Sequence, residues 1–130
     1  MTDFVPCEDD CCAAIADALF GKCKGTPLGN WIEVLEIIEN CEAKIGIIDD
    51  DNNQIEKLKK YNHQLIYDSP DFKIYKKKNR YIIVLINYCE EFLNKNSKRE
   101  KIRNKNFKFC PKQEYKIKLI RQALRNLKIL

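Results

Sequence analysis

The sequence predicts an α/β domain, in which a mostly parallel sheet is flanked by helices. Apolar residues recur at helical spacing over residues 11–19 and again over 31–41. Residues 44–49 form an apolar run that is too short for a helix, is rich in isoleucine and ends in acids, which is typical of a buried parallel strand. Strands that alternate with helices along a chain are the order found in α/β folds.

The first half should begin with a short strand over residues 3–7, followed by a helix to about Phe20 that Asp9 or Asp10 caps. Gly21 and Gly25 should end that helix. A second helix is expected to start at the cap Asn30, and its inner face should carry Trp31, Val34, Leu35, Ile38 and Cys41.

In the second half, a third helix is expected over about 53–61 and a strand over 64–67. Residues 72–76 and 81–86 should form a β-hairpin around the turn 77–80. We further expect a helix over 87–94, an extended piece over 107–110, and a C-terminal helix after Pro111. The apolar side of that last helix should carry Lys116, Ile120, Ala123, Leu124 and Leu127.

Length and composition favour one domain over residues 1–130, because 130 residues with 45% hydrophobic content suffice for one core. The longest apolar run, residues 81–86, is far below the roughly 20 residues that a membrane helix needs. The N-terminus lacks the basic and apolar regions of a secretory signal. We therefore expect a cytoplasmic protein without a membrane partner. Its seven cysteines should then be reduced thiols.

The net charge of +5 is divided unevenly between the two halves of the chain. Residues 1–71 hold 15 Asp/Glu and 6 Lys/Arg, whereas residues 72–130 hold 4 and 18. Such asymmetry indicates a polyanionic partner, an acid–base pairing inside the fold, or simply a solvated basic face. Within the basic half, Lys76, Lys77, Lys78 and Arg80 surround the expected hairpin turn and are candidate contacts for nucleic-acid phosphates.

Acidic residues follow two of the expected strands: Glu8 after the first, and Asp49 with Asp51 after the apolar run. Ligand sites in open α/β sheets lie beyond the carboxyl ends of the strands, so these acids should share one edge. Mg²⁺ prefers oxygen ligands such as one or two carboxylates. Asp49 and Asp51 are thus candidate metal ligands, and Glu8 a ligand or general acid/base. The alternative is that residues 49–53 form a solvated turn that caps a helix.

The pieces 4–8 and 45–51, a glutamate after a first strand and Asp-x-Asp after a later one, resemble the Toprim (topoisomerase–primase) domain. The resemblance covers residues 3–93, and the hairpin region resembles small stand-alone bacterial Toprim-like proteins. One departure is Asp9, which stands where Toprim proteins usually have glycine. The resemblance implies a Mg²⁺- or Mn²⁺-dependent protein that processes or binds nucleic-acid phosphodiesters, with Glu8 as the catalytic residue. The alternative is a non-catalytic interaction module, docking a partner protein or homodimerising, with a degenerate site.

The cysteines and the single histidine, His63, give weaker signals. Cys7, Cys11, Cys12 and Cys23 match no familiar four-ligand zinc spacing and have no histidine nearby. Cys11 falls on the apolar helix face, where a thiol behaves as a small hydrophobe. We expect His63 to be a partly exposed residue at a strand edge.

Overall fold

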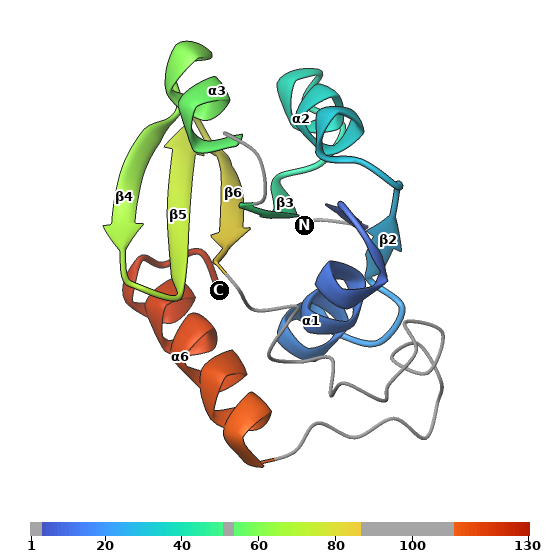
Figure 1. Cartoon of the computed structure of the whole chain (residues 1–130), viewed down its shortest axis with the longest axis vertical. Coiled ribbons are helices and arrows are strands. Elements are labelled where there is room, and N and C mark those ends of the chain that lie inside the picture. The colour runs from blue at the N-terminus through green and yellow to red at the C-terminus, as the bar shows by residue number, and fades with distance from the viewer. Residues whose placement is uncertain (1–3, 51–53, 87–110) are drawn as a thin grey trace.

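The computed structural model describes residues 4–50, 54–86 and 111–130, and it has the predicted α/β architecture (Figure 1). Strands and helices alternate through the first part of the chain, a hairpin follows, and a long helix ends it. In chain order the elements are β1 (Val5–Cys7), α1 (Asp10–Phe20), β2 (Gly25–Pro27), α2 (Trp31–Glu39), β3 (Ile45–Asp49), α3 (Gln54–Lys60), β4 (Gln64–Asp68), β5 (Phe72–Lys77), β6 (Arg80–Leu85) and α6 (Pro111–Asn126).

The six strands form one sheet in the order β2-β1-β3-β6-β5-β4. The first four run parallel to their neighbours, whereas β5 and β4 are antiparallel additions. Every residue of β3 is buried, and β3 pairs with β1 on one side and β6 on the other. The expectation of a central parallel strand at this position, with the first strand in the same sheet, is therefore confirmed.

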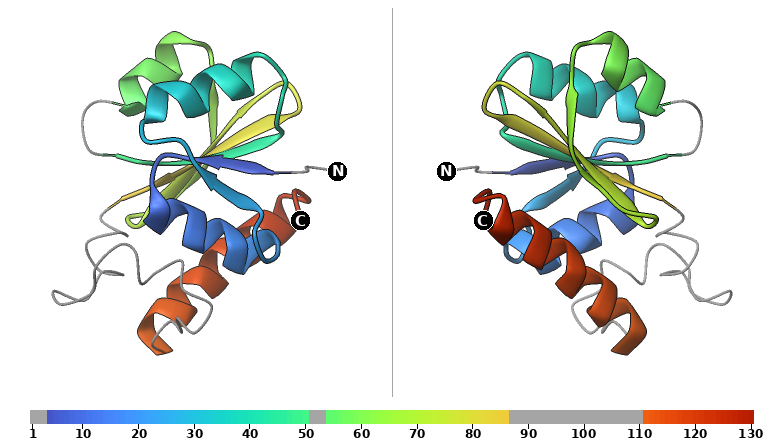
Figure 2. Two further views of the ribbon diagram at one scale, coloured as in Figure 1. Left: turned by 90° about the vertical axis from the view of Figure 1, so that its right-hand side faces the viewer. Right: turned by 90° about the vertical axis from the view of Figure 1, so that its left-hand side faces the viewer.

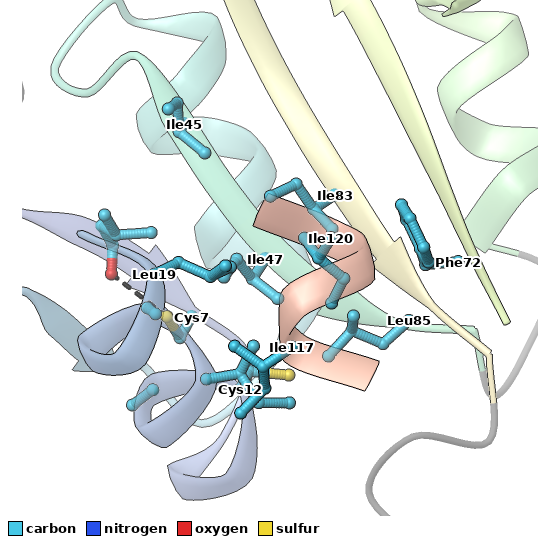
Figure 3. Packing of buried hydrophobic residues seen from close by; sticks show 14 of the residues in the cluster. Cys7, Cys12, Leu19, Ile45, Ile47, Phe72, Ile83, Leu85, Ile117 and Ile120 are labelled. Atoms are coloured by element: carbon cyan, nitrogen blue, oxygen red, sulfur yellow. Dashed lines mark hydrogen bonds between the residues drawn. The ribbon is translucent and has the colours of Figure 1, made fainter. Parts of the chain in front are cut away.

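Helices cover both faces of the sheet, which gives three layers (Figure 2). One apolar cluster joins α1 and α6 to the sheet; Figure 3 shows Ile117 and Ile120 of α6 packed over Ile83 and Leu85. A second cluster joins α2 and α3 to the opposite face through Ile48, Tyr75, Ile82 and Val84. No helix in the described ranges combines the length and the apolar character that crossing a membrane requires.

Strand β2 was not expected from the sequence, in which Gly25 was predicted only to help end the preceding helix. Its three residues include a glycine and a proline, and both are uncommon in strands. The structure shows why Gly25 is needed: a Cβ atom there would lie 2.3 Å from the backbone oxygen of Ala13 in α1. The backbone of β2 therefore approaches the backbone of α1 more closely than any side chain allows.

Two expected inner-face residues lie elsewhere. Cys41 is exposed, because the chain leaves helical geometry after α2 and Cys41 has a positive φ of 61°. In α6 the buried position belongs to Ile117 and not to Lys116, which is half-buried. The helix and the extended piece expected over 87–94 and 107–110 lie outside the described residues.

The C-terminal end of α2 is held to the sheet by Arg80, the first residue of β6. Its Nη1 donates hydrogen bonds to the carbonyl oxygens of Ile38 and Glu39, each at 2.9 Å, and lies 2.8 Å from the sulfur of Cys41. Arg80 is 8% exposed, so this guanidinium is a structural cap that also complements the negative end of the helix dipole. In this structure the guanidinium predicted to contact phosphates is thus bonded to the end of α2.

His63 is buried beside this cap, which corrects the expectation of a partly exposed residue. Its Nε2 lies 2.7 Å from Oε1 of Glu39, whose Oε2 accepts a hydrogen bond from Lys77 at 2.8 Å. A carboxylate only accepts, so Nε2 carries the proton and buried Nδ1 is an acceptor with no partner in the described structure. Burial lowers the pKa of His63 against the raising effect of Glu39, and the cations Lys77 and Arg80 lower it further.

Replacing Arg80 with alanine should lower the free energy of unfolding by about 2–3 kcal/mol, because two carbonyls at the end of α2 lose a charged donor. Lys78→Ala removes the same charge from an exposed position in the neighbouring turn and should change stability by less than about 0.5 kcal/mol. Chemical denaturation of both variants measures the difference. Equal losses would show that Arg80 does not cap α2.

The pH dependence of stability should report His63. The folded state binds the imidazole proton more weakly than the unfolded state does. Well above pH ~6.5, His63 is neutral in both states and does not lower the free energy of unfolding, whereas below that value the free energy of unfolding falls as the pH drops. His63 is the only histidine in the chain, so no other histidine contributes to the pH dependence near neutral pH. His63→Gln keeps a donor for Glu39 and should flatten the fall between about pH 7 and pH 5. Parallel curves for wild type and variant would contradict the assignment.

Candidate metal centre

Glu8 is the first residue after β1, and its backbone is fixed on both sides. Its N–H donates to the carbonyl of Ile47 in β3 at 3.1 Å, and its carbonyl accepts from the N–H of Gly29 at 3.0 Å. These bonds hold Glu8 between β3 and the segment that leads into α2. The residue is only 8% exposed, so its carboxylate has little contact with bulk water.

Asp49 is the last residue of β3 and lies next to Glu8 at the carboxyl edge of the sheet. Oε2 of Glu8 accepts a hydrogen bond from the backbone N–H of Asp49 at 3.1 Å, and Asp49 is 6% exposed. The structure thus brings together two of the three acids that the sequence placed at this edge. Asp51, the third, lies outside the described residues.

Two further residues join this edge that the sequence analysis did not assign to the site. Ligand atoms of Glu8, Asp9, Cys12 and Asp49 all lie within 4.8 Å of one another. Asp9 was expected only as a helix cap, and it does cap α1: its Oδ1 accepts from the N–H of Cys12 at 2.9 Å. The sequence held a signal for this grouping: Asp9 and Cys12 are three residues apart at the start of a helix, and residues at this spacing lie on the same side of it.

The donor set fits a hard divalent cation through Glu8 and Asp49. Two buried carboxylates from neighbouring strands are what Mg²⁺ commonly takes from a protein. Cys12 is fully buried within the apolar cluster under α1, where a thiol acts as a small hydrophobe, and sulfur is a poor ligand for Mg²⁺. Of the cysteines considered for zinc, Cys23 is exposed, whereas Cys7, Cys11 and Cys12 are buried.

Two opposing electrostatic effects act on the acids at this edge. Helix α1 begins at Asp10, directly beside Glu8, and the positive end of its dipole stabilises nearby anions. However, Glu8 and Asp49 repel each other when both are ionised in a site with little water. A bound cation would remove that repulsion, which is the physical reason to expect metal affinity here.

The predicted nucleic-acid contacts lie at the other edge of the sheet. In the pairing of β3 with β6, Ile45 aligns with Tyr81 and Asp49 with Leu85, so the β5–β6 turn lies beyond the start of β3. The four steps from Ile45 to Asp49, at about 3.3 Å each, separate the two edges by roughly 13 Å. The hairpin lysines therefore do not reach a phosphate held at the Glu8–Asp49 edge.

The remaining hairpin cations differ in what they contact. Lys76 lies over the ring of Tyr81, with Nζ 5.8 Å from the ring centroid. Lys77 is paired with Glu39, whereas Lys78 is exposed in the turn with a φ of 56°. Lys76 and Lys78 are thus the hairpin cations that a polyanion can reach without breaking an ion pair.

Comparisons with protein-family models, with curated proteins and with solved structures found no match for this chain.

Proposed function

We propose that this protein binds a divalent cation, Mg²⁺ or Mn²⁺, at the Glu8–Asp49 edge and uses it to bind or process nucleic-acid phosphodiesters. The observation that carries the proposal is the contact between the two acids. Glu8 and Asp49 follow or end neighbouring parallel strands, both are buried, and the carboxylate of one touches the backbone of the other. The resemblance to the Toprim domain supports the same ion and the same substrate class.

The proposed roles of Glu8 and Asp49 follow from their positions. Glu8 and Asp49 would hold the ion, which would polarise a phosphate oxygen in the bound substrate. The hydrogen bond from the N–H of Asp49 orients the Glu8 carboxylate, so Glu8 would be placed to exchange a proton with the attacking or leaving oxygen. The start of α1 beside the site would favour the anionic substrate.

A second candidate function is a non-catalytic interaction module, and two observations favour it. Asp9 occupies the position of the usual Toprim glycine and uses its carboxylate to cap α1. In addition, the hairpin residues Lys77 and Arg80 bond to α2 instead of facing outward. On this reading the chain would keep the fold and use its charged surfaces to dock a partner protein or a second copy.

Thermal melts with metal separate the two functions. Mg²⁺ or Mn²⁺ at about 100 times its dissociation constant should stabilise the wild type by ~2.7 kcal/mol, because the ion binds only the folded state. Asp49→Asn should abolish that gain, because it removes one of the two buried carboxylates that would hold the ion.

Glu42→Gln is the matched control for the melts, because Glu42 is an exposed acid at the amino edge of β3, away from the site. It should keep the full metal effect. A wild type that is not stabilised by either ion would remove the metal site and favour the interaction module.

Binding to nucleic acid should weaken steeply with salt, because each neutralised phosphate releases counterions. On duplex DNA long enough to contact the hairpin as well as the Glu8–Asp49 edge, the double variant Lys76→Ser/Lys78→Ser should flatten the slope of log K against log salt by up to about 1.8. Lys57→Ser/Lys59→Ser, on the exposed side of α3, is the control and should leave the slope nearly unchanged. Lack of binding at low salt would count against the nucleic-acid substrate.

A further inference from the structure

A cavity of about 530 Å³ opens at the amino edge of the sheet, opposite the carboxylate site. Its walls come from the starts of β1, β3 and β6, the end of α1, and the tail that follows α6. Figure 2 shows this tail folding back to the same end of the sheet from which β1 enters. The volume lies within the roughly 300–1,000 Å³ of typical small-molecule sites.

The tail forms one wall of the cavity because α6 ends in a left-handed turn. Lys128 has a φ of 60°, its N–H donates to Arg125, and the N–H of Ile129 returns to the carbonyl of Leu124 at 2.8 Å. This reversal brings Ile129 against the core and makes Ile129 and Leu130 one wall. The wall is thus set by backbone hydrogen bonds and is formed before any ligand binds.

The lining combines an apolar interior with cations. Val5, Leu19 and Ile45 line the cavity as core residues that are only 1–6% exposed, and Phe20 and Tyr81 are half-buried aromatic residues of the same lining. Lys24, Lys44 and Lys128 supply three ammonium groups. Among the described lining residues no Asp or Glu side chain is present, and none of these lysines has an ion-pair partner within the described structure.

Three cationic residues around one concave surface raise the positive potential there, which attracts an anion. The apolar walls would bury a hydrocarbon body at about 25 cal/mol per Å² of surface removed from water. A ligand that satisfies both features has an apolar body and an anionic head.

We propose that this cavity binds a small amphipathic anion, with its apolar body between α1, Tyr81 and the C-terminal tail, and its carboxylate or phosphate among Lys24, Lys44 and Lys128. The site is separate from the carboxylate edge, at the other end of β3, so it does not depend on metal binding. A nucleic-acid backbone fits less well, because its phosphates would meet the lysines but would leave the apolar interior empty.

The test is calorimetric titration of the full chain with three probes: decanoate and decyl phosphate, each below its critical micelle concentration, and the neutral alcohol decanol, below its solubility limit. One saturable site for decanoate or decyl phosphate is expected, at least about tenfold tighter than for decanol. The stronger of the two anions identifies the head group. Inorganic phosphate alone should bind far more weakly, because it lacks the apolar body.

Two triple variants with the same change in charge provide the control. Lys24→Gln/Lys44→Gln/Lys128→Gln should weaken binding at least about tenfold, whereas Lys57→Gln/Lys59→Gln/Lys60→Gln on α3 should stay within about twofold of wild type. All six lysines lack ion-pair partners in the described structure, so both variants should melt close to the wild type.

The NMR shift changes caused by decanoate should centre on Val5, Ile45, Tyr81 and Ile129, which line the cavity. Equal loss in both variants, equal binding of decanol, no saturable site, or shift changes centred on another surface would each overturn the proposal.

Discussion

The register between β3 and its two parallel neighbours is the constraint on which the rest of the structure depends. β3 is buried on both faces, so a slip of one residue would turn its core side chains to the wrong helices. Gly46 fixes this register further, because a Cβ atom there would lie 2.8 Å from Cγ1 of Val34 in α2. With β3 fixed, Asp49 falls beside Glu8 at one edge, and the cavity opens at the other.

The two edges of the sheet carry residues of opposite charge. The acidic and basic halves of the sequence do not correspond to these two edges. The carboxyl edge gathers acids from the N-terminal half, as the charge pattern indicated. The amino edge, however, draws Lys24 and Lys44 from that same acidic half and Lys128 from the basic half. Much of the remaining basic charge there is used internally, since Arg80 and Lys77 hold the end of α2. A net charge per segment therefore predicts a surface poorly, because folding interleaves the segments.

Local pattern was sufficient for most of the fold and for part of the candidate site. Periodicity and caps identified the described helices, and the order of acids at strand ends placed Glu8 and Asp49 at one edge. The failures share a cause, which is that they depend on long-range contact. β2 exists because Gly25 lets its backbone meet α1, Arg80 is buried by the end of a helix about 40 residues earlier, and His63 is buried by Glu39. None of these partners is visible in the local sequence.

We propose that Glu8 and Asp49 together bind a divalent cation. The most direct measurement is a crystal structure grown with Mn²⁺, with data collected for its anomalous signal. We predict one anomalous peak at the carboxyl edge of the sheet, bonded directly to a carboxylate oxygen of both Glu8 and Asp49. No anomalous peak at that edge in crystals soaked with Mn²⁺ in excess, with the Glu8 carboxylate still accepting from the N–H of Asp49, would contradict it.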